Sequence, residues 1–315
     1  MFREDFNKFK GQNPLLSDVL RFDQDQHENE KVVQKIEIGN VNFMGEFGLR
    51  HPKEWKVYQL AENPGLMFIK NPFTPIGQRY WIRRCLKDFT KKPNKLNLDI
   101  HNIIPCNEEW WTFSQKNNSV LNKLRWATLG YHHNWDTKVY SEDSKGDFPL
   151  DLACLTKYVA DLLNFEGFNA EAAIVNFYHM NSRLSGHTDH SEQYLEAPLF
   201  SFSFGQSAIF LIGGLTLDVK PTALLLDSGD IVVMSKESRL CYHGVPKILQ
   251  SNAAPWNSKN VDENLDITKL ECDILQICKD EQNWMPFENY VNNSRINVNV
   301  RQVLREGCRS LNFMK

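Results

Sequence analysis

The sequence predicts a protein built mainly of β-strands that pack as a sandwich or barrel, with helical text before them. From about residue 126, short apolar or β-branched runs follow one another, and Gly, Ser, Asn or Asp residues separate them. Short strands at close spacing with turn residues between them are typical of such folds. The runs are AAIVNFYHM, LFSFSFG, AIFLIGG, ALLLDSGDIVVMS and RINVNVRQV. Before residue 126, segments such as YWIRRCLKDF are helix-like instead.

Composition sets the broad class of the protein. Hydrophobic residues make up 42% of the 315 residues and charged residues 24%, which is ordinary for a globular enzyme. A net charge of −3 excludes a protein held to DNA by bulk charge, although a local basic face would suffice for binding. The start, MFREDFNKFKGQNP, has no apolar signal region, and no stretch is long enough to span a bilayer. We expect a soluble, intracellular protein whose seven scattered cysteines are reduced thiols.

One segment is strongly basic. Residues 79–125 hold ten Lys or Arg against four acids, a local charge of +6, and Trp81, Trp110 and Trp111 lie among them. Basic residues interleaved with aromatic ones are typical of nucleic-acid surfaces. The alternative is a solvated helix face with tryptophans in the core. The basic residues are Arg79, Arg83, Arg84, Lys87, Lys91, Lys92, Lys95, Lys116, Lys123 and Arg125.

These patterns divide the chain into one large domain with an appendage. Residues 1–125 are expected to form an N-terminal helical extension with nucleotide-recognition elements, residues 126–305 the core, and residues 306–315 a C-terminal tail. Within the core, residues 251–290 hold eight acids against three lysines, a net charge of −5. We interpret this stretch, which begins near NAAPWN, as an insertion on the surface.

The segment SGHTDHSE contains a candidate metal site. In an extended segment His187 and Asp189 project to the same face, so both can reach one ion. Two imidazoles and one carboxylate on one side of a metal form the facial triad of non-haem Fe(II) oxygenases. His243, which follows a strand-like run and precedes a Gly turn, is the predicted second histidine. His190 is the competing ligand, but as the neighbour of Asp189 it should point to the other face.

Other interpretations of these histidines exist. A His-x-Asp pair also occurs by chance, and a buried histidine bonded to an aspartate is a common structural arrangement. We interpret His179, His132 and His133 as hydrogen-bonding or surface residues because they lie outside the two motif stretches.

The run RINVNVRQV predicts a strand with one polar face. Arg295, Asn297, Asn299 and Arg301 alternate with apolar residues, so they share a face. Two buried guanidinium groups are costly unless anions meet them, and a small dicarboxylate is the obvious candidate. The alternative is an exposed edge strand with two ordinary surface arginines.

Together these stretches resemble the AlkB family, and within it the animal branch known as the first AlkB homologue. The resemblance covers residues 126–305 and rests on the order of an Asn-Phe-Tyr strand at residue 176, the HTD motif, LFSFSFGQSAIFLIGGL, SGDIVVMSKESRLCYHGV and RINVNVRQV. KLRWATLGYHHNWDTKVY carries the likeness to the animal branch. The resemblance implies an α+β, mainly β fold: a double-stranded β-helix (jelly roll) with flanking helices and the N-terminal helical extension.

The resemblance also implies a cofactor set, and it assigns residues to it. His187, Asp189 and His243 would hold Fe(II) and serve as the catalytic centre. Arg295 would bind the distal carboxylate of 2-oxoglutarate with help from Asn176 and Tyr178. Asn297 and Arg301 would lie near the end that chelates iron. Tyr131 would stack on a flipped base.

The implied reaction is 2-oxoglutarate-dependent oxidation of methylated bases in tRNA or DNA. O2 would be the co-substrate, and formaldehyde, succinate and CO2 would be released. Two departures from the bacterial repair enzymes put direct transfer of their specificity in doubt. Ser191 stands where an acid helps to read the base, with Glu192 next, and Thr216, Leu217 and Asp218 replace basic residues.

Three other functions stay open at this point. They are demethylation of histone or other protein methyl-lysine, non-catalytic binding on the same scaffold, and DNA lyase activity at abasic sites. We expect a monomer without membrane attachment that works in the nucleus, the mitochondrion or both.

Overall fold

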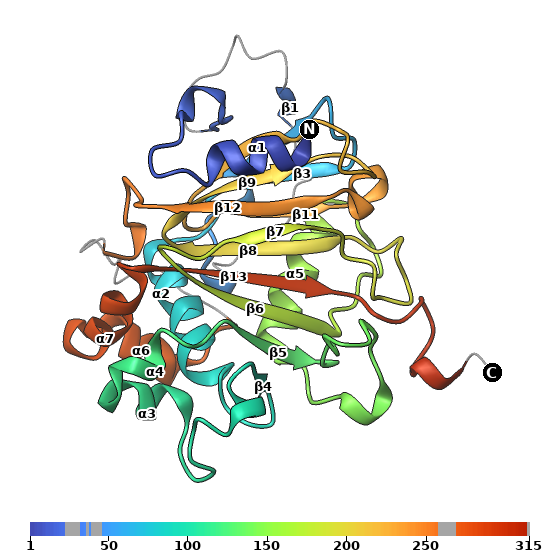
Figure 1. Ribbon diagram of the computed structural model, residues 1–315. Coiled ribbons are helices and arrows are strands. Elements are labelled where there is room, and N and C mark those ends of the chain that lie inside the picture. Colours follow the sequence, from blue (N-terminus) through green and yellow to red (C-terminus); the bar gives the residue numbers. More distant parts are fainter. Residues whose placement is uncertain (23–31, 36–37, 39–45, 258–268, 314–315) are drawn as a thin grey trace.

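The computed structural model describes residues 1–22, 32–35, 38, 46–257 and 269–313. Two antiparallel sheets face one another, as the jelly-roll prediction requires (Figure 1). In the larger sheet the strands run in the order β1-β2-β3-β11-β8-β13-β6-β5-β4. Their bounds are β1 Val32–Lys35, β2 Lys56–Leu60, β3 Leu66–Lys70, β4 Lys95–Leu96, β5 Trp126–Gly130, β6 Ala172–His179, β8 Leu199–Gly205, β11 Ile231–Met234 and β13 Ser294–Arg301.

The smaller sheet has the order β10-β9-β12-β7. It carries both predicted metal-binding histidines, since β7 ends at His187 and β12 begins at His243. These two residues are directly paired across the sheet. The bounds are β7 Leu184–His187, β9 Ser207–Ile212, β10 Thr222–Leu226 and β12 His243–Leu249.

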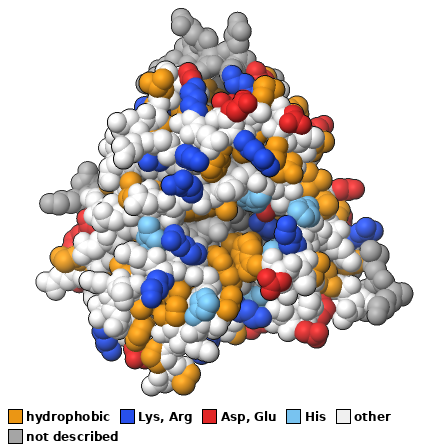
Figure 2. Space-filling view, viewed as in Figure 1, with side chains coloured by type: hydrophobic (Ala, Val, Ile, Leu, Met, Phe, Trp, Pro, Cys, Tyr) orange, Lys and Arg blue, Asp and Glu red, His pale blue; other side chains and the backbone are white. Residues whose placement is uncertain are grey.

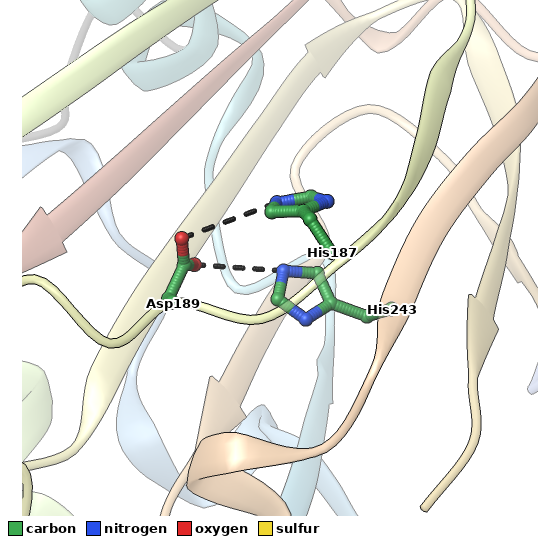
Figure 3. A group of neighbouring side chains, drawn as sticks. All are labelled: His187, Asp189 and His243. Carbon is green, nitrogen blue, oxygen red and sulfur yellow. Dashed lines mark ion pairs between the residues drawn. The ribbon is translucent and has the colours of Figure 1, made fainter. Parts of the chain in front are cut away.

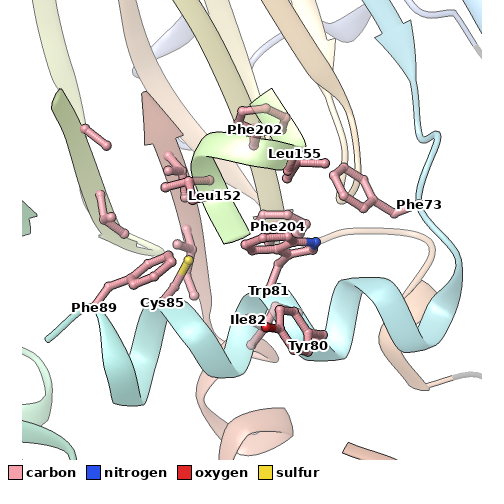
Figure 4. Packing of buried hydrophobic residues seen from close by; sticks show 14 of the residues in the cluster. Phe73, Tyr80, Trp81, Ile82, Cys85, Phe89, Leu152, Leu155, Phe202 and Phe204 are labelled. Carbon is pink, nitrogen blue, oxygen red and sulfur yellow. The ribbon is translucent and has the colours of Figure 1, made fainter. Parts of the chain in front are cut away.

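Helices cover the outer face of the larger sheet. Helix α2 begins where the Thr74 hydroxyl accepts a hydrogen bond from the Gly77 amide and Pro75 fixes the first turn. Its Trp81 ring packs with Phe202 and Phe204 of the sheet in one apolar cluster (Figure 4). The helices are α1 Phe2–Phe9, α2 Pro75–Arg83, α3 Trp110–Lys116, α4 Asn118–Leu121, α5 Leu150–Leu162, α6 Cys272–Lys279 and α7 Glu281–Val291. None of the described helices is long and apolar enough to cross a membrane.

The boundary expected at residue 126 does not separate two folded bodies. Strands β2 and β3 come from the first 125 residues, yet β3 pairs with β11 at the middle of the larger sheet. Sequence reasoning missed them because KVYQL and LMFIK are short and their partner strand lies far along the chain. The N-terminal part is therefore not only helical, and it completes the core.

Helix α1 lies against the smaller sheet on the side away from the larger one (Figure 1). Phe2 is fully buried there, and a Cβ added to Gly186 would meet its ring at 2.7 Å. Gly213 approaches the same ring, with 3.0 Å from an added Cβ. One glycine in β7 and one just after β9, strands that both pair with β12, therefore make room for this ring next to His187.

The stretch 251–290 is only partly the surface insertion that its charge suggested. Residues 258–268 lie outside the described part of the chain. The rest includes Trp256 and Trp284, both fully buried, and helices α6 and α7 pack against α2. Of its acids in the described part of the chain, Glu271, Asp273, Asp280 and Glu281 are exposed and Glu288 is half-buried, while Trp256 and Trp284 join the core.

Candidate metal centre

Three side chains converge between the two sheets. One ligand atom from each of His187, Asp189 and His243 lies within 4.8 Å of the others (Figure 3). The Nε2 atoms of His187 and His243 lie 3.9 and 3.5 Å from the Asp189 carboxylate oxygens. Residues 187 and 189 come from the end of β7, and His243 opens the neighbouring strand β12, as the sequence predicts. His190 is exposed and bonds to Thr188, so the structure does not bring it into the cluster.

Backbone contacts orient both imidazole rings toward a shared point. The Nδ1 atom of His187 donates to the Ser185 carbonyl oxygen at 3.0 Å. His243 does the same with the Cys241 carbonyl oxygen at 3.1 Å. A proton on Nδ1 leaves Nε2 with its lone pair, which is the form that binds a metal ion. Burial and the neighbouring His243 lower the pKa of His187 to about 4, so its ring is neutral at pH 7.

The carboxylate of the cluster is held in its charged form. Burial would raise the pKa of Asp189, but Arg301 and the two histidines hold it well below its ordinary value. Arg301 Nη2 donates to Asp189 at 2.8 Å, and its Nη1 donates to Glu192 at the same distance. Glu192 also accepts from Arg239 at 2.9 Å. Both buried carboxylates beside the cluster are therefore neutralised by arginines.

Arg295, at the other end of β13, has a different environment. Only 2% of the side chain is exposed, yet no described carboxylate lies within ion-pair distance of it. Its Nη atoms donate to the Gln206 carbonyl oxygen at 3.1 Å and the Ser203 hydroxyl at 2.7 Å. The Nε atom is buried without a hydrogen-bond partner among the described atoms. Burial lowers the pKa of Arg295 to about 10, so this group is still charged at neutral pH.

The remaining residues predicted for the co-substrate lie on the two central strands. Tyr178 is directly opposite Arg295, and Asn176 is directly opposite Asn297 in the β6–β13 pair. Opposite residues in an antiparallel pair share one face of the sheet. The Asn297 amide donates to the Ser201 hydroxyl at 2.8 Å. The four side chains therefore lie on one surface that runs from Arg295 toward Asp189.

Comparisons with known proteins agree with this geometry. Residues 65–301 match the model of the 2OG-Fe(II) oxygenase superfamily. The chain is 42% identical over 271 residues to nucleic acid dioxygenase ALKBH1 of Mus musculus, covering 82% of this chain and 69% of that protein. It is 32% identical over 270 residues to tRNA demethylase abh1 of Schizosaccharomyces pombe, covering 79% and 82%.

A solved structure shows the same fold. The structure of OsALKBH1 aligns with a TM-score of 0.50 and 19% identity, and it covers 76% of this chain and 97% of that one. The chain belongs to the AlkB family of 2OG-Fe(II) oxygenases.

Membership of this family implies Fe(II) and 2-oxoglutarate, and the residues present fit both. Two imidazoles and one carboxylate form the donor set of a facial triad and leave positions for other ligands. The Arg295 guanidinium, buried without a carboxylate, suits one end of a dicarboxylate. When bound, iron and 2-oxoglutarate supply the oxidising power, while the protein supplies position, charge and a dry pocket.

Tyr131 lies differently from what a base-stacking role requires. Its side chain is 0% exposed, and its hydroxyl donates to Glu142 at 2.5 Å. The Lys145 ammonium lies over the ring, 4.3 Å from its centroid. Stacking on a base would first require the ring to be uncovered, because both contacts hold it inside the protein.

The other histidines act as expected for hydrogen-bonding residues. His132 bonds to Thr128 at 2.8 Å, and His179 bonds to Ser294 at 3.3 Å. His133 has a position that the sequence did not predict, since it bonds to Ser191 at 3.0 Å, two residues after the predicted ligand Asp189.

Sequence reasoning also missed Glu192, Arg239 and Ser203 as parts of the site. The alternation in LFSFSFG could have identified Ser203, because Phe200, Phe202 and Phe204 join the apolar cluster under the helices and the serines face the other way. No comparable signal marks Arg239, which lies in a short 3-10 helix and reaches the site through its long side chain.

The basic segment 79–125 is not one continuous surface. Arg79 is buried and bonds to Glu281, Arg84 bonds to Asp151, and Arg83 pairs with Asp88. Arg79 thus ties α2 to α7, Arg84 ties the segment after α2 to α5, and the Arg83 pair is local to that segment. Only part of the +6 charge is therefore available to a nucleic acid, and the alternative of tryptophans in the core holds for Trp81, Trp110 and Trp111.

Proposed function

We propose that this chain demethylates bases of nucleic acid, tRNA or DNA, by oxidation that depends on Fe(II) and 2-oxoglutarate. The observation that carries the proposal is the neutralisation of both buried carboxylates of the site, Asp189 in the triad by Arg301 and Glu192 beside it by Arg301 and Arg239. A methyl-lysine cation would need a free carboxylate near the metal, and neither of these is free. A neutral or weakly charged base does not need one. The relatives named above support the same substrate class.

Aromatic side chains at the mouth of the site suit a base. Trp135 is 44% exposed, and its ring centroid lies 4.7 Å from that of His133 and 5.1 Å from that of Trp126. His133 in turn contacts Ser191 beside the triad. Base stacking on aromatic rings contributes about 1 to 3 kcal/mol per base. We therefore assign the stacking role to Trp135 in place of the covered Tyr131.

Each residue of the site would have a separate role in the reaction. Arg295 would bind one carboxylate of 2-oxoglutarate, and Asn176 and Tyr178 would line the same surface. Arg301 would hold the Asp189 carboxylate in the orientation that the metal needs. The methyl group on the base nitrogen would be hydroxylated and lost as formaldehyde, with succinate and CO2 as the other products.

The test is a substrate screen with purified protein, Fe(II) and 2-oxoglutarate. Methylated tRNA, methylated DNA and a methyl-lysine histone peptide are given side by side, and the nucleosides and peptides are measured by mass spectrometry. We expect loss of a base methyl group with wild-type protein and none with Asp189→Ala. Demethylation of the peptide without any change in the nucleic acids would contradict the proposal.

The same screen separates the lyase alternative. DNA with an abasic site is incubated with the protein in the presence of a chelator, where iron chemistry stops. Strand cleavage that survives chelation and the Asp189→Ala change would be a second, metal-independent activity. Location in the nucleus or mitochondrion and a monomeric state stay predictions. Imaging of the tagged chain and light scattering after size-exclusion chromatography would test them.

A further inference from the structure

A polar cavity lies at the turn between β6 and β7, outside the metal centre. It has a volume of about 570 Å³. None of the described residues that line it is acidic, and two of them are arginines. They are Asn122, Arg125, His179, Met180, Asn181, Ser182 and Arg183.

The two arginines are available for an anion. Both are exposed, and neither makes an ion pair with a described residue. Arg125 Nη1 donates to the Ser182 hydroxyl at 2.8 Å, which fixes the guanidinium at the wall of the cavity. Arg79, Arg83 and Arg84 differ, because each of them already forms an ion pair with an acidic side chain of the protein. An anion with several oxygens, such as a phosphate, suits a pair of free guanidinium groups.

Two hydrogen bonds within the turn shape the wall of the cavity. The Ser182 amide donates to the His179 carbonyl oxygen at 2.7 Å, and the His179 amide donates to the Ser182 hydroxyl at 3.0 Å. The His179 Nε2 atom is buried and has no partner among the described atoms. Burial and the nearby Arg125 lower the pKa of this histidine, so the positive charge of the cavity comes from the arginines.

The position along the chain links this cavity to the metal centre. Arg183 precedes strand β7, and the ligand His187 ends that strand four residues later. At about 3.3 Å per residue, the two are roughly 13 Å apart along the strand. In Figure 2, Lys and Arg side chains lie on both sides of the hollow in this face of the molecule.

We infer that this cavity binds a backbone phosphate of the nucleic acid whose methylated base enters the metal centre. The inference rests on the proposed function for the identity of the ligand. The cavity would hold the strand at a phosphate away from the reacting nucleotide, so it would set affinity and position without reading the base.

The test compares Arg125→Ala, Arg183→Ala and the double variant with wild type. Affinity for a short single-stranded RNA is measured by fluorescence anisotropy over a range of salt concentrations. Each phosphate contact contributes about 0.7 to the slope of log K against log salt, so the double variant, which loses the one phosphate held by both arginines, should lose about 0.7. Arg305→Ala, which removes an exposed arginine outside the cavity, is the matched control and should keep the wild-type slope.

Inorganic phosphate serves as a second probe of the same cavity. Binding of phosphate to wild type but not to the double variant, together with an unchanged RNA slope, would overturn the backbone assignment in favour of a free phosphate. An unchanged slope and no phosphate binding would overturn the cavity as an anion site.

Neither of those results would contradict the proposed function, provided that the wild-type protein still demethylates nucleic acid. Failure of the proposed function would appear instead as the absence of demethylation by wild-type protein in the substrate screen. Thermal unfolding of each variant checks that the turn still folds.

Discussion

The two ends of strand β13 carry arginines that are equally buried but differ in whether a protein carboxylate pairs with them. Arg301 donates to the Asp189 and Glu192 carboxylates, so its charge is neutralised within the protein. Arg295 donates to two carbonyl oxygens and one hydroxyl, and no described carboxylate lies within ion-pair distance of it. The Nε atoms of both arginines are buried without a partner among the described atoms. A buried charge without a counter-ion is costly unless an anion arrives. The difference indicates that Arg301 stabilises the folded protein, whereas Arg295 is positioned to bind a carboxylate of the co-substrate.

Removal of a metal ligand should have the largest effect. His187→Ala, Asp189→Ala and His243→Ala each remove one member of the triad, and we expect each to abolish Fe(II)-dependent succinate formation while the fold survives. His190→Ala, which changes an exposed histidine outside the cluster, should keep activity. The measurement is succinate by mass spectrometry beside a circular dichroism spectrum. Full turnover by His243→Ala would remove that residue from the triad.

Truncation of Arg301 should affect the fold, in contrast to Arg295. Arg301→Ala leaves two buried carboxylates without this guanidinium, and breaking a buried pair typically costs about 3 to 5 kcal/mol. Arg295→Ala leaves no protein carboxylate behind, so its cost in metal-free protein should be smaller. Urea unfolding of both variants gives the two free energies. An equal loss in both would mean that the two ends of β13 do not differ as described.

A smaller effect is expected in the pH dependence of the free energy of unfolding, and neither Arg295 nor Arg301 should contribute to it. Burial, then the nearby Lys95, lower the pKa of His132 to about 4, below the ordinary 6.5. The unfolded chain therefore binds more protons between pH 6.5 and 4, and the free energy of unfolding falls as pH drops through that window. His132→Gln should flatten this decline, whereas the exposed His101→Gln should not. Urea unfolding at several pH values is the measurement, and the same slope in His132→Gln would exclude this histidine as the cause.

The sequence was sufficient where a local pattern determines geometry. The alternation in RINVNVRQV placed Arg295 and Arg301 on one face, because side chains in a strand alternate with a period of two. The spacing of His187 and Asp189 predicted two ligands on one side for the same reason. The strand-like run before His243 and the Gly turn after it indicated that residue as the second histidine, and the family resemblance implied the same residue.

What the sequence could not predict depends on contacts between distant segments. The charge of residues 79–125 suggested a surface, yet Arg79 meets Glu281 and Arg84 meets Asp151 inside the protein. The same holds for Tyr131, whose partner Glu142 and neighbour Lys145 are ordinary loop residues in the sequence. A count of charges within a window contains no information on such partners.

We interpret Arg295 as the buried cation that binds a carboxylate of 2-oxoglutarate, and a titration with 2-oxoglutarate tests this role. Truncating one member of a buried charge pair costs about 2 to 5 kcal/mol, which is roughly thirty-fold to several thousand-fold in affinity. We expect Arg295→Ala to raise the KM for 2-oxoglutarate at least about thirty-fold, with nucleic-acid affinity nearly unchanged. Arg295→Lys should recover only part of the loss, because an ammonium lacks the planar fork. A wild-type KM in Arg295→Ala would contradict the account, and so would an unchanged KM with loss of nucleic-acid binding.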